Sequence, residues 1–192
     1  MGYMPARLIL ASKSPRRADL LRLAGIPFTI RAADIAEVPA ADESPSAYVR
    51  RLAESKAIAS GIGEDEIVLG ADTVVVADGL ILEKPADAAD AARMLRLLSG
   101  RTHEVITGVC IRTSSKTETA TDTTRVRFVE MTAREIAGYA ASGEPMDKAG
   151  AYGIQGLASK FIDRVEGCYF NVVGLPIALV YRLLVAANYT GS

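Results

Sequence analysis

Short apolar runs alternate with amphipathic stretches along this chain, and turn or cap signals close most of them. Runs of strand length predict strands at Arg7–Ala11, Ile67–Leu69, Val74–Ala77, Leu80–Leu82, His103–Ile111, Thr121–Val129, Ala158–Val165 and Tyr169–Val173. Asp78-Gly79 is typical of a hairpin turn between two of these runs, and Glu166-Gly167 separates the last pair. The segment from Thr121 alternates polar and apolar residues, so a half-exposed strand is expected there.

Helix signals lie between the predicted strands. The expected helices run from Pro15 to Ala24, from Pro45 to near Gly61, from Asp87 to Leu98, from Thr132 to Ala141 and from Pro176 onward. Two of them begin with serine followed by proline, a favourable pairing of N-cap and first helical residue. Thr132 and Glu135 have the spacing of a capping box. Mixed helices and strands, with both hairpins and crossovers, predict an α/β or α+β fold with a mixed sheet.

Length and charge limit the classes of protein that this chain could be. Its 192 residues fit one domain or two closely packed lobes, and we treat residues 1–192 as a single domain. With 49% hydrophobic and 23% charged residues, a globular core is expected and disorder is not. The net charge of -1 provides no global basic field, so no nucleic-acid polymer is expected as the main partner.

The cysteines and the apolar segments bear on the cellular compartment. Cys110 and Cys168 form neither a zinc motif nor a disulfide framework, which favours a reducing compartment and hence the cytoplasm. Met1–Arg7 lacks the apolar stretch of a signal peptide. Phe170–Tyr189 is apolar but is broken by glycine, proline and arginine, and a bilayer needs about 20 apolar residues. We expect a buried C-terminal helix there, and no membrane partner.

The first candidate for chemistry is the segment Ser12–Arg17, between a predicted strand and the first turn of a helix. Backbone N–H groups and the helix dipole favour an anion at that position. Arg16 and Arg17 add guanidinium donors suited to phosphate, although cations there oppose the dipole by about 0.3–1 kcal/mol each. The alternative is a pair of solvated arginines that tolerate this cost, and local sequence does not decide between the two.

Two further candidates are charged residues in apolar surroundings. On a helical wheel, Lys56 falls on one face with Val49, Leu52 and Ala59, so its ammonium must reach water or meet an anion. Asp72 interrupts an apolar two-strand segment, where an unpaired carboxylate would be costly to bury. A bound metal ion would remove that cost, whereas the plain alternative is an aspartate in a tight turn between strands.

Glycine and lysine residues near these candidates suggest a ligand as well. Gly70, two residues before Asp72, is consistent with close approach of a ligand to the backbone. Lys84 follows the predicted hairpin and is expected near Asp72. The glycine-rich segment Asp147–Gly156 lacks the Walker A pattern, so it is either a binding segment or an ordinary loop. His103, the only histidine, is interpreted as a structural polar residue.

In combination and in this order, these segments resemble the Maf-like family over nearly the whole chain. The matching segments are Leu10–Arg17, Glu37, Glu54–Ala57, Leu69–Thr73, Glu83–Pro85, Lys148–Gly156 and Asn171–Pro176. Lys13 departs from the small residue that is common between the two serines of the first segment. The resemblance implies a long mixed sheet flanked by helices, as in the inosine-triphosphate pyrophosphatases, with two lobes, a central cleft and usually a homodimer.

The resemblance also implies an activity. Members hydrolyse nucleoside triphosphates to the monophosphate and pyrophosphate with Mg²⁺, or with Mn²⁺ or Co²⁺ in its place. Gly-Ala-Asp-Thr together with Tyr-Gly-Ile-Gln-Gly is similar to the subgroup that acts on dTTP and UTP. The subgroup that acts on 7-methyl-GTP has Ser-Asp-Gln at the first of these places.

Roles for individual residues follow from this resemblance and from the chemistry of phosphates. Glu37 and Asp72 are expected to hold the metal, and Asp72 to orient or deprotonate the attacking water. The triphosphate is expected to bind Ser12, Ser14, Arg16, Lys56 and Lys84, the two lysines also acting in catalysis. The pyrimidine is expected to be read by Arg17, Thr73 and a buried amide, Gln155.

Three alternatives compete with this hypothesis. The same reaction could act on ITP, XTP or 7-methyl-GTP. A non-enzymatic nucleotide-binding regulator of septum formation would need the phosphate cluster but not both carboxylates, so the presence of Glu37 and Asp72 favours an enzyme. An RNA-binding module through Arg16 and Arg17 conflicts with the balanced net charge.

Overall fold

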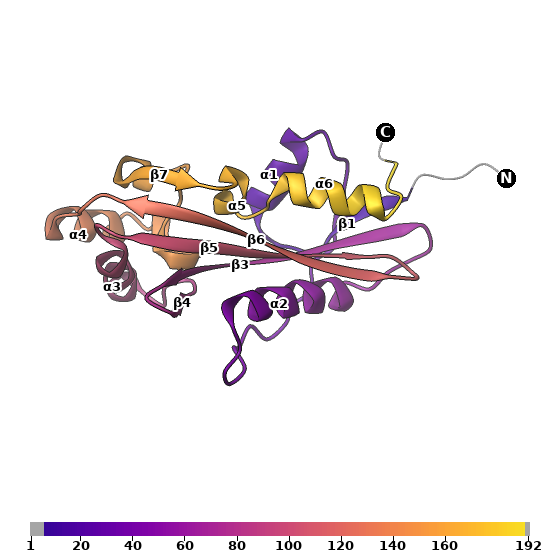
Figure 1. Cartoon of the computed structure of the whole chain (residues 1–192), viewed down its shortest axis with the longest axis horizontal. Coiled ribbons are helices and arrows are strands. Elements are labelled where there is room, and N and C mark those ends of the chain that lie inside the picture. The colour runs from indigo at the N-terminus through magenta and orange to yellow at the C-terminus, as the bar shows by residue number, and fades with distance from the viewer. Residues whose placement is uncertain (1–5, 191–192) are drawn as a thin grey trace. The chain divides into compact units, whose positions relative to one another are not determined.

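A computed structural model describes residues 6–190 of the chain, so residues 1–5 of the N-terminal stretch considered above lie outside it. The described residues form a mixed α/β structure whose seven-stranded sheet has the order β2-β1-β3-β5-β6-β7, with β4 also paired to β3 (Figure 1). The predicted fold class, a mixed sheet flanked by helices, is therefore confirmed.

Two compact units divide the chain, and the division falls within three strands. The first unit comprises the described residues up to Asp72, together with Thr107–Asp122 and the chain from Gly174 onward. The second comprises Thr73–Ile106 and Thr123–Val173. The strands that contribute to both are β3 (Glu66–Ala77), β5 (Thr102–Arg112) and β6 (Thr117–Phe128).

In the first unit, parallel strands carry helices on both faces. β1 (Arg7–Leu10) pairs in parallel with β2 (Thr29–Ile30) and with the first part of β3. Figure 1 shows α1 (Pro15–Leu23) and α6 (Ile177–Ala186) on one side of these strands and α2 (Pro45–Ala59) on the other. The caps agree with the prediction for α2, because the Ser44 side chain accepts a hydrogen bond from the Ala47 N–H.

Two glycines allow α2 to lie directly on the sheet. A Cβ atom on Gly70 would be 2.0 Å from the backbone oxygen of Ala53, and one on Gly108 would be 2.3 Å from the backbone oxygen of Val49. Any side chain at either position would therefore push the helix away. This corrects the interpretation of Gly70, because the backbone that approaches it is that of α2 and not a ligand.

The second unit has a core of its own. β4 (Leu80–Leu82) forms the predicted hairpin with β3, and β7 (Ile162–Glu166) pairs antiparallel with β6. α3 (Ala88–Leu98) packs against α4 (Ala133–Ala141), which begins with the predicted capping box. Three short 3₁₀ helices follow: η1 (Glu144–Asp147), η2 (Ala149–Ala151) and η3 (Leu157–Phe161).

Several predicted boundaries differ from the structure. β3 runs unbroken through Gly70–Thr73, where the sequence predicted two strands, because the carboxylate of Asp72 is paired and can stay within the sheet. The predicted strand Ala158–Val165 is η3 followed by β7, and the predicted strand Tyr169–Val173 is the short helix α5. Apolar runs this short fit either element, so periodicity could not decide between them.

The apolar C-terminal segment forms α6, as predicted, and its buried face consists of Leu179, Val180, Leu183 and Leu184. Among residues 6–190, we find no helix with the length and apolar composition needed to cross a bilayer.

Candidate active site

The ammonium group of Lys56 joins two carboxylates in the first unit. Its Nζ atom lies 2.5 Å from Oδ1 of Asp72 and 2.7 Å from Oε1 of Glu37. The side chains of Lys56 and Asp72 are 12% and 11% exposed, whereas that of Glu37 is 42% exposed. The three residues thus form a charged cluster that is shielded on the Asp72 side and open to solvent on the Glu37 side.

The contact between α2 and β3 explains why this cluster forms. Side chains alternate along a strand, so Gly70 and Asp72 face the same side of β3. The turn of α2 that lies against Gly70 runs from Ala53 to Ala57 and carries Lys56, so the carboxylate two residues further along the strand meets that lysine.

The predicted stripe on α2 was correct in part. Its buried residues are Tyr48, Val49, Leu52, Ala53 and Ala57. Ala59, the last residue of the helix, is exposed, whereas Lys56 falls within the face that Leu52, Ala53 and Ala57 bury. The lysine meets an anion, as one of the two predicted solutions required, and the anions are the chain's own Asp72 and Glu37.

Arg51 fixes the irregular segment that carries Glu37. Its Nε and Nη2 atoms donate to the carboxylate of Glu43 at 2.7 and 2.6 Å, and Nη2 also donates to the backbone oxygen of Val38 at 3.0 Å. The hydrogen bonds from Arg51 lower the pKa of Glu43 to about 2. A residue adjacent to Glu37 is thereby tied to α2, a function of Arg51 that the sequence pattern did not reveal.

Arg17 is buried, which excludes the solvated alternative for this residue. Its Nε donates to the backbone oxygen of Gly174 at 2.9 Å, and its Nη1 donates to Ser12 Oγ at 3.0 Å and to the backbone oxygen of Ala71 at 2.8 Å. Burial is the main cause that lowers the pKa of Arg17, and Asp72 opposes that shift. The guanidinium links the start of α1, the residue before Asp72 and the segment before α6.

This arrangement gives Arg17 a structural function that the sequence did not indicate. Two of the acceptors described above are backbone oxygens, which carry no side-chain signature, and one of them is 157 positions away. Reading of the pyrimidine by Arg17 stays a prediction.

The remaining predicted phosphate ligands of this unit lie at the start of α1. Ser12 is buried, and its Oγ also accepts a hydrogen bond from the Ser14 N–H at 3.2 Å. Ser14 occupies the N-cap position, but its side chain does not cap the helix. Arg16 is partly buried, whereas Lys13 is exposed and pairs with Asp34 at 2.6 Å. Arg17 thus donates hydrogen bonds both to Ser12 and to the backbone oxygen of Ala71, the residue before Asp72.

The two carboxylates that pair with Lys56 fit one class of metal ion. Glu37 and Asp72 offer carboxylate oxygens around one cationic group, which shows that a cation is accommodated between them. Within residues 6–190, there is no cluster of three or more histidine, cysteine or acidic side chains that could bind a metal. Mg²⁺ keeps several waters and commonly uses one or two carboxylates plus substrate phosphates, so this pair suits it better than an ion that needs an all-protein cage.

The other predicted site residues belong to the second unit. Lys84 is exposed and follows β4, and Thr73 is partly buried on β3. Gln155 is exposed in the turn Gly153–Gly156, where the Gly156 N–H donates to the Gly153 backbone oxygen at 3.1 Å. The expectation of a buried amide is therefore corrected, because a turn places this side chain in solvent.

His103 is a core residue, as predicted. It is 2% exposed, its Nε2 atom lies 2.8 Å from the hydroxyl of Tyr152, and its ring packs edge-on against Phe128. Burial lowers the pKa of His103 to about 4, so the ring is neutral at pH 7.

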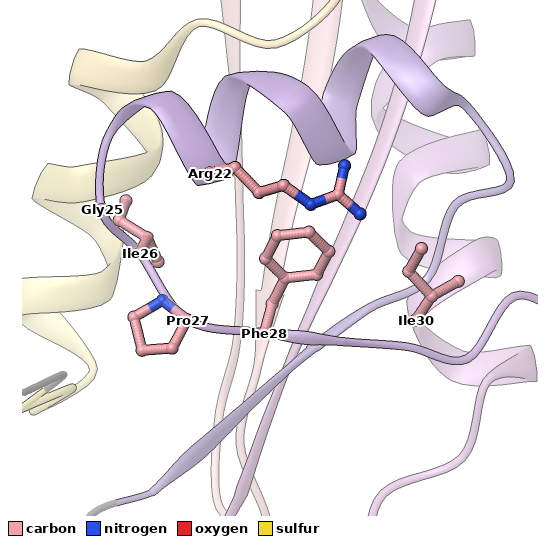
Figure 2. A pocket seen from close by; sticks show the side chains of 6 residues that line it. All are labelled: Arg22, Gly25, Ile26, Pro27, Phe28 and Ile30. Atoms are coloured by element: carbon pink, nitrogen blue, oxygen red, sulfur yellow. The ribbon is translucent and has the colours of Figure 1, made fainter.

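A pocket of about 720 Å³ lies elsewhere in the first unit. Figure 2 shows its lining, in which the guanidinium of Arg22 lies beside the ring of Phe28. It is formed by the last turn of α1 and the residues that follow, Gly25–Phe28 and Ile30. The Ser12–Arg17 segment is at the opposite end of that helix, so none of the predicted site residues lines this pocket.

Comparison with known proteins agrees with these features. The family model for Maf-like proteins matches residues 7–187, and the chain belongs to that family. It is 56% identical over 178 residues to a dTTP/UTP pyrophosphatase of Koribacter versatilis, covering 92% of each chain. It is 51% identical over 185 residues to a dTTP/UTP pyrophosphatase of Bacillus cereus, covering 95% of this chain and 96% of that protein.

A solved structure supports the fold independently. The Ham1 protein of Staphylococcus aureus superimposes with a TM-score of 0.53 over 94% of this chain and 99% of its own, at 12% sequence identity. At that identity the likeness concerns the fold alone.

Proposed function

We propose that this protein hydrolyses nucleoside triphosphates, dTTP and UTP above all, to the nucleoside monophosphate and pyrophosphate. The observation that carries the proposal is the cluster of Lys56, Asp72 and Glu37, in a chain 56% identical to a dTTP/UTP pyrophosphatase. Such a cluster combines an ammonium that can pair with phosphate and two carboxylates that can hold a metal ion or activate water. Removal of excess or unwanted nucleotides would be the cellular purpose.

Cations and hydroxyls would bind the triphosphate. Arg16, Ser12 and Ser14 surround the start of α1, where helix N–H groups and the dipole favour an anion. Lys56 can turn from the carboxylates to a phosphate oxygen, since one of its two partners, Glu37, is open to solvent. Charge on the pyrophosphate leaving group would be stabilised by these cations. A role for Lys84 in binding the triphosphate is proposed only because this residue belongs to the family motif Glu83–Pro85.

Asp72 would act on the attacking water. Its carboxylate is shielded and held at one oxygen by Lys56, which fixes its orientation. The water would transfer a proton to this carboxylate as its oxygen bonds to the α-phosphorus, while the bond from that phosphorus to the bridging oxygen breaks and pyrophosphate departs. A divalent ion held by Glu37 and Asp72 would neutralise phosphate charge and make the water more acidic.

Recognition of the base would depend on residues outside the cluster of Lys56, Asp72 and Glu37. Gln155 presents its amide in solvent, and a primary amide can both donate to and accept from a pyrimidine edge. Thr73 and Arg17 are proposed to contact the pyrimidine because both belong to the family motifs.

The cellular setting is part of the same proposal. Cys110 and Cys168 are free thiols, in keeping with the reducing cytoplasm. A homodimer is proposed from the family resemblance, and static light scattering of the purified protein measures it directly.

The deciding experiment mixes the purified protein and Mg²⁺ with dTTP, UTP, CTP, ITP, XTP and 7-methyl-GTP. We expect pyrophosphate and monophosphate from dTTP and UTP at the highest kcat/KM. Release of inorganic phosphate and a nucleoside diphosphate would refute the mechanism. Preference for ITP, XTP or 7-methyl-GTP would refute the choice of substrate. Binding of nucleotides without turnover would indicate a regulator instead of an enzyme.

A variant tests the role of Asp72 within this scheme. Asp72→Asn keeps the size of the side chain but cannot take a proton, so we expect pyrophosphate release to fall by about 10²–10⁴-fold. Circular dichroism and a urea titration show whether the variant is folded. Activity within a few-fold of the unmodified protein would exclude Asp72 as the base.

A further inference from the structure

One tyrosine–glutamate pair holds both ends of the turn that carries Gln155. The hydroxyl of Tyr139 accepts a hydrogen bond from the Gly153 N–H at 3.2 Å, at the first residue of the turn. The carboxylate of Glu144 accepts one from the Leu157 N–H at 3.0 Å, just after it. Tyr139 in turn donates to Glu144 Oε1 at 2.8 Å, which closes the network.

The glycines on each side of Gln155 fit this network. A Cβ atom on Gly156 would lie 2.3 Å from Oε1 of Glu144, so only glycine lets the carboxylate reach the backbone there. A Cβ atom on Gly153 would lie 2.7 Å from Cε of Lys148. The packing of Glu144 against Gly156 and of Lys148 against Gly153 therefore accounts for glycine at these two positions.

Lys148 anchors the network at its base. Its Nζ atom donates to the backbone oxygen of Glu144 at 2.7 Å and to Oδ1 of Asp147 at 2.6 Å. Tyr139 is 5% exposed, and its burial, followed by its hydrogen bond to Glu144, raises its pKa above the ordinary value. The hydroxyl thus remains a neutral donor to Glu144 over the physiological pH range.

We propose that Tyr139 and Glu144 are positioning residues for base selection, because they fix the backbone on both sides of the exposed Gln155 amide. This inference rests on the proposed function, in which Gln155 contacts the pyrimidine. Neither residue contacts the substrate in this scheme. They restrict where the amide can be, and a ligand gains affinity when the group that it meets is preorganised.

Kinetics with two variants test the proposal. Tyr139→Phe removes the hydroxyl that links Gly153 to Glu144, and Gln155→Ala removes the amide itself. We expect Tyr139→Phe to raise the KM for dTTP and UTP by about tenfold, the loss expected for one or two hydrogen bonds, with kcat within about threefold. The preference for dTTP over ITP should fall toward that of Gln155→Ala.

The double variant distinguishes positioning from general destabilisation. If Tyr139 acts through Gln155, then Tyr139→Phe should have little further effect on base preference in a Gln155→Ala background. Glu144→Gln should give an intermediate preference, because the amide keeps one acceptor oxygen. Independent, additive effects of Tyr139→Phe and Gln155→Ala on the ratio of kcat/KM values would overturn the proposal.

Glu135→Gln is the matched control. Glu135 belongs to the same α4 and accepts hydrogen bonds from Thr132 in the capping box, so its replacement disturbs the helix end and not the turn. It should lower the thermal midpoint slightly and leave base preference unchanged. A change in preference as large as that of Tyr139→Phe would count against a specific role for the pair.

A measurement without turnover separates this inference from the proposed function. Amide hydrogen exchange at Gly153 and Leu157 should accelerate by about tenfold in Tyr139→Phe and remain unchanged in Glu135→Gln. Should the unmodified protein bind pyrimidine nucleotides but release no pyrophosphate, the proposed function fails, and nucleotide affinities measured by calorimetry replace kcat/KM in the comparison of variants. Unchanged exchange at both amides, or unchanged base preference in those affinities, refutes the positioning role.

Discussion

Arg17 occupies a helix position that is unfavourable for a cation, but its hydrogen bonds outside the helix offset this cost. A cation in the first turn of a helix opposes the helix dipole, which makes an arginine there a poor choice for helix stability alone. Its guanidinium donates to the backbone oxygens of Ala71 and Gly174 and to Ser12 Oγ. The residue therefore joins three segments around Asp72, and its unfavourable position in the helix is offset by acceptors outside that helix.

Arg17→Lys tests this structural function. A lysine keeps the charge but cannot reproduce the donor geometry of Nε and Nη1, so at least one buried backbone oxygen loses its partner. We expect the free energy of unfolding to fall by about 1–3 kcal/mol in a urea titration. Arg22→Lys is the control, because the exposed pair of Arg22 with Asp19 should change the same quantity by less than about 0.5 kcal/mol. Equal changes in both variants would contradict the prediction.

The position of Lys56 between two carboxylates leads us to expect an effect of this residue on metal binding. Its ammonium lies between the two carboxylates proposed to hold the ion, so without substrate it competes with a divalent cation for the same oxygens. We expect Lys56→Met to bind Mn²⁺ about tenfold more tightly in the absence of nucleotide, as measured by the paramagnetic resonance of free Mn²⁺. Lys13→Met, which removes the partner of the exposed Asp34, should leave the affinity unchanged. Weaker Mn²⁺ binding by Lys56→Met would contradict competition between the two cations.

At the scale of elements, the contact of α2 with β3 positions the cluster. Gly70→Ala would bring a methyl group within 2.0 Å of the Ala53 backbone oxygen, so the helix must move or the strand must distort. We expect a loss of more than about 3 kcal/mol in the free energy of unfolding, measured by urea titration, or failure to fold.

A second glycine provides the control for this prediction. Gly138 is within α4, and a Cβ atom there meets nothing within 4 Å. Gly138→Ala should therefore stabilise the protein by roughly 0.5–1 kcal/mol, because alanine loses less conformational entropy in a helix. A loss of stability in Gly138→Ala as large as that in Gly70→Ala would show that the loss does not depend on the contact with Ala53.

The elements that sequence predicted well are those with local signals. Ser44, Asp87 and Thr132 cap the helices that follow them, as their side-chain chemistry indicated. Short apolar runs carried no such signal, which is why the segment at Tyr169–Val173 was predicted as a strand and is a helix. The same limit applies to the site: the charges of Lys56 and Asp72 in apolar surroundings could be detected, but the network of Tyr139 and Glu144 depends on backbone contacts that leave no pattern.

At the scale of the whole molecule, hydrogen-bonded carboxylates and a buried histidine respond to acid at different pH values. Glu43 and Glu66 of the first unit have lowered pKa values through hydrogen bonds from arginines, so their contribution to stability is present above about pH 4.5 and is lost below it. The second unit contains His103, whose buried ring is neutral when folded and takes up a proton when unfolding exposes it. Between the ordinary pKa of 6.5 and the folded value of about 4, the unfolded state binds more protons.

Stability should therefore decline as the pH falls from 7 toward 4, before the carboxylates with lowered pKa values titrate. From the two pKa values of His103, we expect the free energy of unfolding to be about 2 kcal/mol lower at pH 5 than at pH 7. His103→Gln removes the titrating group, so its own loss between the two pH values should be under about 0.5 kcal/mol, whatever its stability at pH 7. Urea titrations of both proteins at both pH values measure the two differences. Because each protein is compared with itself, the packing defect left by the substitution cancels. An equal loss in the two proteins would show that the acid sensitivity comes from groups other than His103.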